Sequence, residues 1–426
     1  MKVTSVKGFR DVLPPEATRR RQLLRVSAAL LEAYGFREME LPLLEKVELF
    51  RRSVGADSDI VEKEMYCFED KDGSWLALRP EGTASLVRAY IESGMTRSHP
   101  EAKLYYLGPM FRRERPQKGR YRQFSQIGAE CLGRNDAAAD AETITLVADI
   151  CEAAGMQDYR IEINSLGDSA CRPAYRKALG AFARERVAKL CTDCRSRLER
   201  NPLRLLDCKS EGCREAMQGA PFMVDGLCGD CAAHHRRVLE LLEAGGVKVC
   251  ANPYMVRGLD YYCRTAFEIR SSRLGAQDSV GGGGRYDGLV SALGGGEVAG
   301  VGFAFGIERM LLALEEQVDL GDSPELVVAP VGEDAMVEAM RFARKLRRDG
   351  VRVEMENPKR KLKTQMKRAD RVGARYVVIL GQAELDAGRA SLRDMKNKTD
   401  FECAVALDAA AGQIMDTIRG AGKGGA

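Results

Sequence analysis

The chain has 426 residues, 45% of them hydrophobic and 30% charged, which is typical of a globular protein with two or three domains. No apolar run approaches the ~20 residues of a membrane span, and no apolar signal region opens the sequence, so we expect a cytoplasmic protein without membrane segments. The net charge is only +4, so any attraction for nucleic acid must come from local patches.

The N-terminal region begins with a predicted helix over residues 16–34, because apolar residues recur there at helical spacing and Gly35 offers a stop. The segment FREMELPLLEKVELF predicts a strand broken at Pro42 and then a short helix. A further strand is expected at Trp75–Arg79.

A densely basic segment follows, with six Arg or Lys and one acid, Glu114, between Arg112 and Arg122. The apolar residues on both sides predict a β-hairpin with a cationic tip. Guanidinium groups grip phosphate oxygens two at a time, so the composition indicates phosphate recognition. For such a segment taken alone, a solvated charged turn is the commoner explanation.

The middle of the chain predicts a helix at 137–154, a strand at 159–163 and a helical, cysteine-rich module inserted at about 170–245. Strand character returns at 266–269. Glycine-rich turns then lead to AGVGFAFGIERMLLALEE, which predicts an apolar strand running directly into a helix at Gly306.

Ser323 and Pro324 mark a join between two domains, 1–322 and 323–426. In the second, three apolar segments alternate with helices at 334–349 and 361–372, which predicts a small α/β layer with a largely parallel sheet. Fourteen Lys or Arg and four Asp or Glu lie between Arg341 and Arg375, a local net charge of +10.

Five segments place polar residues among apolar, glycine-punctuated strands: RPEGT, the basic hairpin, RGLDYY, GGGGRYD and GIER. The glycine run lacks the ending of a P-loop, and in isolation a tight turn explains it. In GIER, Arg309 falls in the first helical turn, where the helix dipole disfavours a cation. We therefore expect an anion near it, with a buried ion pair as the alternative.

Taken in this order, the segments resemble class II aminoacyl-tRNA synthetases, and specifically the histidyl-tRNA synthetase family, over essentially the whole chain. The FRRE hairpin looks like the second class motif and GFAFGIERMLLAL like the third, while FREMELPLLEKVELF takes the place of the dimer-forming first. RGLDYY and GGGGRYDGL are similar to the two segments peculiar to the histidine enzyme.

The resemblance implies an α+β catalytic domain built on an antiparallel sheet, with a helical insertion, followed by an α/β anticodon-binding domain. It implies a homodimer that uses ATP with Mg²⁺ to activate L-histidine as histidyl-adenylate and then charges tRNA(His). Arg112 and Arg257 would be catalytic, gripping the α-phosphate and bridging it to the substrate carboxylate. The implied ATP-binding residues are Arg112, Glu114, Arg120, Phe124 and Arg309.

Histidine recognition needs acceptors for an ammonium group and a partner for each imidazole nitrogen. By resemblance, Glu81, Thr83 and Gln126 would bind the amino group, while Glu130 and Tyr262 would bind the ring. Gly82, Arg112, Arg257 and Tyr261 complete the implied histidine site. By analogy, Gln117 to Gly119 at the hairpin tip would face the acceptor end of the tRNA.

Two questions stay open in the sequence. The pairs Cys191/Cys194 and Cys228/Cys231, with Cys208 and Cys213 between them, have spacings compatible with a structural zinc site on the two pairs. The family does not generally require a metal there, and six reduced thiols are the alternative. The competing function is a non-catalytic histidine-binding regulatory paralogue of the synthetase. Such paralogues usually lack the anticodon domain and erode the ATP motifs, which this sequence keeps.

Overall fold

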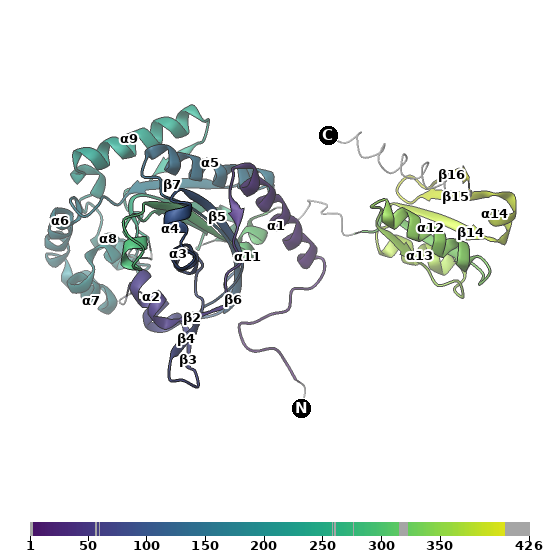
Figure 1. Ribbon diagram of the computed structural model, residues 1–426, viewed down its shortest axis with the longest axis horizontal. Helices are drawn as coiled ribbons and strands as arrows, with labels where there is room; N and C mark the ends of the chain where they lie inside the picture. The colour runs from purple at the N-terminus through teal and green to yellow at the C-terminus, as the bar shows by residue number, and fades with distance from the viewer. Residues whose placement is uncertain are drawn as a thin grey trace. The chain divides into compact units, whose positions relative to one another are not determined.

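The computed structural model describes residues 3–55, 58, 60–257, 259, 261–275, 277–314 and 323–404, with the backbone alone for 389 and 401–404. The chain divides into two compact units, Met1–Val318 and Asp319–Ala426, each visible in Figure 1. Among the described helices, none is both long and apolar enough to cross a membrane.

The first unit is built on an eight-stranded sheet with the order β1-β5-β6-β11-β10-β9-β7-β8. Its strands are β1 (Arg37–Glu38), β5 (Ala102–Phe111), β6 (Gln123–Leu132), β7 (Arg160–Ser165), β8 (Val249–Ala251), β9 (Cys263–Arg270), β10 (Ser279–Arg285) and β11 (Gly300–Gly306). The central pairings are antiparallel, and only the edge pairs β1–β5 and β7–β8 run parallel. This sheet confirms the predicted fold class.

Helices and a second, smaller sheet surround this sheet. The helices are α1 (Glu16–Ala33), α2 (Val47–Ser53), α3 (Thr83–Glu92), α4 (Met95–Ser98), α5 (Ala137–Ala153), α10 (Leu289–Ala292) and α11 (Ile307–Ala313), with a π-turn at Ile60–Glu64 and a 3₁₀ turn at Ser272–Leu274. A small antiparallel sheet has the order β2-β4-β3, with β2 (Leu44–Lys46), β3 (Tyr66–Glu69) and β4 (Trp75–Leu78).

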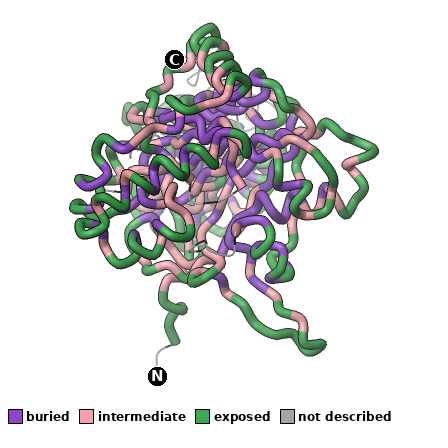
Figure 2. The backbone as a smooth tube through the Cα atoms, turned by 90° about the vertical axis from the view of Figure 1, so that its left-hand side faces the viewer, coloured by how far each residue is buried: buried purple, intermediate pink, exposed green. Residues whose placement is uncertain are grey.

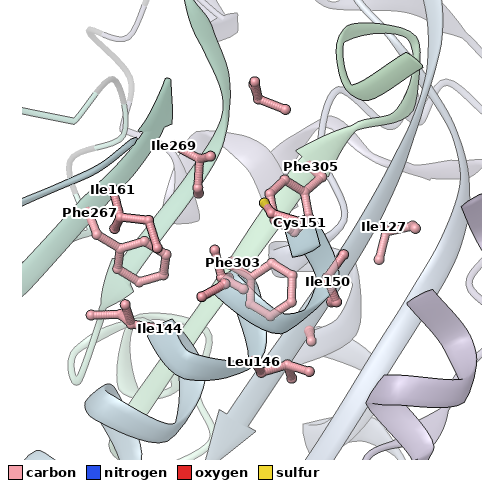
Figure 3. Packing of buried hydrophobic residues seen from close by; sticks show 14 of the residues in the cluster. Ile127, Ile144, Leu146, Ile150, Cys151, Ile161, Phe267, Ile269, Phe303 and Phe305 are labelled. Atoms are coloured by element: carbon pink, nitrogen blue, oxygen red, sulfur yellow. The ribbon is translucent and has the colours of Figure 1, made fainter. Parts of the chain in front are cut away.

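Alternation along the strands divides the large sheet into two faces. Ile127, Phe303 and Phe305 pack with Ile144 and Ile150 of α5 in one apolar cluster, shown in Figure 3. The residues that alternate with Ile127 on β6 and with Phe303 and Phe305 on β11 face the opposite side of the sheet. Figure 2 colours each residue by its burial, and the buried residues gather inside the fold while exposed residues lie at its outside.

The inserted module is helical, as expected, and its helices lie together at one side of the first unit in Figure 1. They are α6 (Arg172–Arg184), α7 (Thr192–Arg200), α8 (Glu211–Ala216) and α9 (Gly229–Ala244), linked by 3₁₀ turns at Val187–Lys189, Pro202–Leu205 and Met223–Gly226. The module has its own apolar cluster, which includes Tyr175, Leu179 and Leu198. Helix α9 also reaches α5, where His234 Nε2 lies 2.7 Å from the buried Asp140 carboxylate.

The glycine run is a strand rather than the expected turn, because Gly281–Gly284 form the middle of β10. A Cβ on Gly281 would lie 2.4 Å from the carbonyl oxygen of Ala304, and one on Gly283 would lie 2.0 Å from that of Gly302. No side chain fits at either position, so the sheet here requires glycine.

The second unit contains β12 (Leu326–Val331), α12 (Met336–Arg348), β13 (Val353–Met355), α13 (Leu362–Arg371), β14 (Tyr376–Gly381), α14 (Gln382–Ala387), β15 (Arg389–Asp394) and β16 (Thr399–Ala404). Its sheet has the order β13-β12-β14-β15-β16. The pairs of β12 with β13 and β14 are parallel, as predicted. The hairpin β15–β16 is antiparallel, so the expectation of a largely parallel sheet was wrong for that half.

The two basic helices of this unit lie on opposite faces of its sheet. Helix α12 packs with Leu326 and Val328, whereas α13 packs with Val327 and Ala329, the alternate residues of β12. The charge of +10 that is continuous in sequence is therefore divided between two surfaces.

Candidate active site

A cavity of about 330 Å³ lies on the sheet face opposite α5, a size within the range of small-molecule sites. Its floor uses strand residues that alternate with the core, such as Gln126 beside Ile127 and Ala304 beside Phe303. All but two of the residues expected at the site line this cavity: Glu81, Thr83, Arg112, Glu114, Arg120, Phe124, Gln126, Arg257, Tyr261, Tyr262 and Arg309.

One wall comes from the basic hairpin, whose strands β5 and β6 bracket the tip. Arg112 donates from Nε to the carbonyl oxygen of Pro80 at 2.9 Å, and its guanidinium carbon lies 5.2 Å from the centre of the Phe124 ring. Glu114 lies between two arginines, 3.1 Å from Arg120 Nη1 and 3.8 Å from Arg112 Nη1. The wall thus presents oriented cations beside an aromatic face.

Arg257 belongs to the wall opposite this hairpin. Its Nη1 lies 3.4 Å from Glu268 Oε1, and its guanidinium carbon lies 5.4 Å from the centre of the Tyr262 ring. Arg257 Nε and Gln126 Oε1 are both buried without a hydrogen-bond partner among the described residues. Buried polar atoms are normally paired, so these two indicate that a polar ligand enters the cavity.

Arg309 stands in the first turn of α11, as the sequence predicted. Its guanidinium donates to the backbone carbonyl oxygens of Ser279 and Gln277. Burial and the neighbouring Arg120 lower the pKa of Arg309. Two like charges held near each other favour an anion, so the end of the cavity that Arg120 and Arg309 line is suited to a negatively charged ligand.

Glu81 is buried where β4 leads into α3. Its carboxylate accepts the backbone N–H groups of Thr83 at 2.8 Å and Ala84 at 2.9 Å, so it caps the helix. Burial raises the pKa of Glu81 despite these two bonds.

Glu130 and Gly82 are the two expected residues that lie behind the cavity lining. Glu130 is 1% exposed and accepts hydrogen bonds from Thr83 Oγ1 at 2.6 Å and Tyr286 Oη at 2.5 Å. Burial raises the pKa of Glu130 to about 8. Gly82 meets the ring of Tyr106, which does line the cavity, and a Cβ there would lie 2.2 Å from the ring.

The hairpin tip differs in part from its expected arrangement. Gln117 and Lys118 are exposed, and Gln117 donates to the side chain of Gln277 at 2.8 Å. Gly119 is buried and lines the cavity, because it packs against Leu312 and Arg309. Gly119 therefore faces the cavity and not outward.

Three residues in or behind the cavity lining were given no role by the sequence analysis. Glu308 accepts the backbone N–H of Ser125, and Glu268 accepts from Ser279 Oγ at 2.7 Å. Tyr286 follows the glycine run, but its bond to Glu130 spans 156 residues. Only Glu308 carried a local signal, as the acid in GIER, since the other partnerships arise from folding.

The cysteines of the module do not form the predicted quartet. Cys191 and Cys194 group with Cys208 and Cys213, whereas Cys228 and Cys231 group with Asp168 and Cys171. The prediction of one site on the two Cys-x₂-Cys pairs was wrong because these pairs begin different helices, α7 and α9.

The antiparallel sheet and its arginine-lined cavity define a class II aminoacyl-tRNA synthetase, which is a ligase. A family model described as histidyl-tRNA synthetase matches residues 8–310, and one described as anticodon binding domain matches 325–416. The chain belongs to the histidyl-tRNA synthetase family.

Individual relatives cover nearly the whole chain. The histidine–tRNA ligase of Geobacter sulfurreducens is 48% identical over 412 residues, 97% of this chain and all of the relative. That of Trichlorobacter lovleyi is 50% identical over 395 residues, 93% of this chain and 94% of the relative. The crystal structure of apo S. aureus histidyl-tRNA synthetase is 34% identical with a TM-score of 0.79, and covers 97% of this chain and all of that one.

Proposed function

We propose that this chain activates histidine with ATP and transfers it to tRNA(His). The observation that carries this function is a single cavity that collects arginines suited to phosphates beside buried acceptors suited to an amino acid. In the first step a carboxylate oxygen of histidine attacks the α-phosphorus of ATP, and pyrophosphate leaves. In the second, a terminal ribose hydroxyl of the tRNA attacks the carbonyl carbon, and AMP leaves.

Neither step requires a covalent bond to the enzyme, so catalysis consists of alignment and charge neutralisation. Arg112 grips the α-phosphate, and Arg257 bridges it to the histidine carboxylate. Arg120 and Arg309 hold the γ-phosphate end, and both line the cavity. Phe124 stacks on adenine with Glu114 at the amino edge of the base.

ATP reacts as its Mg²⁺ complex, in which the metal neutralises phosphate charge. The cavity fits this ion, because Glu268 lines it and would supply carboxylate oxygens, which Mg²⁺ prefers.

Histidine is selected by groups that would stay unpaired with another amino acid. Glu81, Thr83 and Gln126 bind the ammonium group, and the unpaired Oε1 of Gln126 supports this assignment. Glu130 and Tyr262 serve the imidazole nitrogens. Glu130 accepts a hydrogen bond from Thr83, which lines the cavity, so it lies directly behind the lining where the ring would bind. Gly82 and Tyr261 shape the wall.

The tRNA is bound through phosphate contacts of Lys and Arg in the second unit and at the hairpin tip. The exposed arginines of α12, Arg341, Arg344 and Arg348, give that unit a cationic surface. We assign residues 1–322 to the catalytic domain and 323–426 to the anticodon-binding domain, and we place the reaction in the cytoplasm.

We also propose a homodimer. The segment resembling the first class motif leaves large apolar side chains uncovered, with Leu43 42% and Leu44 44% exposed. Phe68 on the neighbouring strand β3 is 43% exposed. A second copy of the chain would cover these residues.

Histidine-dependent exchange of pyrophosphate into ATP tests the function. We expect exchange with histidine and none with other amino acids, followed by charging of tRNA(His) in a second assay. The absence of exchange, or equal exchange with another amino acid, would contradict the proposal. Histidine binding without exchange would instead identify the regulatory paralogue, against which the lining arginines and the anticodon-domain match argue.

A further inference from the structure

The inserted module contains two clusters of potential metal ligands. The four-thiol cluster is Cys191, Cys194, Cys208 and Cys213, and the mixed cluster is Asp168, Cys171, Cys228 and Cys231. Within each cluster the ligand atoms all lie within 4.8 Å of one another. The described cysteines form no disulfide.

The spacing of the sulfur atoms fits a tetrahedral ion. Zn–S bonds of about 2.3 Å in a tetrahedron put two sulfur atoms about 3.8 Å apart. Cys191 Sγ and Cys208 Sγ are 3.9 Å apart. A disulfide would join only two of the atoms, at about 2.05 Å. Convergence of four ligands on one point therefore suits a metal better than pairwise bonding.

Both clusters repeat one local arrangement. Cys191 and Cys228 are the residues immediately before α7 and α9, and Cys194 and Cys231 follow one turn later. The backbone N–H of Cys191 donates to Cys213 Sγ at 3.1 Å, and that of Cys228 donates to Cys171 Sγ at 3.1 Å. Amide donors and helix N-termini stabilise a thiolate, which is the form that binds metal.

The two clusters are nested along the chain. The mixed cluster joins the residues that enter the module, Asp168 and Cys171, to those that begin its last helix. The four-thiol cluster lies inside this loop, between α7 and α8. The module is formed of short helices around a small apolar cluster, and a bound metal would supply folding energy that so small a core lacks.

The mixed cluster also lies where the module meets the catalytic sheet. Asp168 Oδ2 is 3.8 Å from Arg264 Nη2, and the backbone N–H of Arg264 donates to Gly167 O at 2.8 Å. Arg172, the first residue of α6, donates to the carbonyl oxygen of Tyr262. An ion here would hold together the module and the start of β9.

We propose that the module binds two structural Zn²⁺ ions, one in the four-thiol cluster and one in the mixed cluster. Four closed ligands per ion are the pattern of structural rather than catalytic zinc. Thiolates with a single carboxylate suit the borderline softness of zinc, whereas the harder Mg²⁺ and Ca²⁺ prefer sites composed of oxygen alone.

Metal analysis of the full chain, purified without chelators under reducing conditions and then supplied with Zn²⁺, tests the proposal. We expect about two equivalents of zinc per chain in the wild type, and about one each in Cys194→Ser and Cys231→Ser. The double variant should hold less than about 0.2 equivalents. Cys250→Ser, which alters an exposed cysteine outside both clusters, should keep both ions.

A wild-type chain with less than about 0.2 equivalents would overturn the proposal, and one with a single equivalent would overturn the second site. Iron in place of zinc would overturn the identity of the metal.

Loss of both ions in a single-cysteine variant could reflect failed folding, so Co²⁺ substitution of the wild type gives a second measurement. Tetrahedral thiolate coordination predicts sulfur-to-cobalt charge-transfer absorption that rises until two equivalents are bound. Asp168→Ala should weaken cobalt binding at the mixed cluster, which supplies three of the seven thiolates, and should leave the absorption of the four-thiol cluster in place. It should damage the fold less because Asp168 is partly exposed, and Asp193→Ala is the matched control. A spectrum without charge-transfer bands would contradict both sites.

Discussion

Arg257 combines an ion pair at Glu268, a contact with the Tyr262 ring and an unpaired Nε at the cavity. Its charge is therefore held in place before any substrate arrives. Such preorganised cations contribute most where negative charge develops, since they need no rearrangement during the reaction.

Replacing Arg257 by Ala should lower the rate of histidine-dependent exchange by roughly 10²–10³-fold, the range seen when one charge-stabilising donor is removed. Arg257→Lys should recover only part of this rate, because lysine cannot bridge two anionic groups in a plane. Single-turnover adenylate formation measures both variants. Arg160→Ala, which breaks ion pairs outside the cavity, should keep wild-type rates, and equal losses in the two alanine variants would refute the role.

Glu130 makes the stability of the first unit depend on pH. Burial raises its pKa from the ordinary glutamate value of 4.5 to about 8 on folding, so between these pH values the folded state holds a proton that the unfolded state has lost. Its contribution to stability is full below pH 4.5, declines as pH rises towards 8 and stays low above that.

Glu130→Gln should therefore flatten the fall in unfolding free energy between pH 5 and 8, by at most about 1.4 kcal/mol per pH unit. Urea unfolding of both proteins across this range measures the difference. Parallel pH profiles would show that the carboxyl group does not titrate there. Glu142→Gln, at a half-exposed carboxylate on α5, is the control and should keep the wild-type slope.

At the scale of elements, strand β10 supports the cavity because its middle, Gly281–Gly284, has no side chains. A Cβ on Gly282 would lie 2.7 Å from Arg257 Nη1 and 2.6 Å from the carbonyl oxygen of Phe267. The guanidinium could move, but the backbone oxygen could not, so the strand would shift or Arg257 would be displaced.

Gly282→Ala should raise the KM for histidine roughly tenfold or more and cost about 1–3 kcal/mol of stability, as overpacking does. Steady-state exchange kinetics and thermal unfolding measure the two effects. Gly288→Ala lies in the same glycine-rich motif, where nothing would meet the new Cβ within 4 Å. It should behave as the wild type, and a similar KM in both variants would contradict this account.

The elements most readable from the sequence were those whose pattern is local. The hairpin and the strand that runs into a helix at Gly306 follow from alternation and a single break. Strand β10 could not be predicted in this way, because glycine has a low strand propensity. The requirement for glycine there comes from the close approach of the neighbouring strands β9 and β11. The cysteine pairs were visible by spacing, but which pairs meet is decided by helix packing.

The burial of Glu130 could not be predicted from the sequence either. Alternation with Ile127 and Ala129 predicts only that it faces away from α5. That it lies beneath Thr83 and Tyr286 depends on contacts with α3 and with the end of β10. For the same reason, the residue types of the site could be predicted from the sequence, whereas their arrangement around the cavity depends on the fold.

At the scale of the whole molecule, one surface of the first unit is left exposed by the residues of that unit that the structure describes. Leu44 on β2 pairs with Leu78 on β4, and Phe68 on β3 pairs with Leu76 on β4, so the strand register puts these four side chains on one face of the small sheet. Leu44 and Phe68 are each more than 40% exposed, and neighbouring exposed apolar side chains of this kind are typical of a contact with another protein. Since Leu44 lies in the segment resembling the first class motif, a second copy of this chain is the expected partner.

Phe68→Glu should therefore convert a dimer into a monomer, because a symmetric interface would bury the new carboxylate twice without a cation to pair it. Sedimentation equilibrium of the wild type should give twice the 46.9 kDa of one chain, and the variant should give the mass of one chain. Val337→Glu is the matched control, because Val337 is 58% exposed on α12 in the other unit and lies outside this face. A monomeric wild type, or a variant that stays dimeric, would refute this interface. If the variant is a monomer that still binds histidine but exchanges pyrophosphate slowly, the dimer contributes to the geometry of the cavity as well as to assembly.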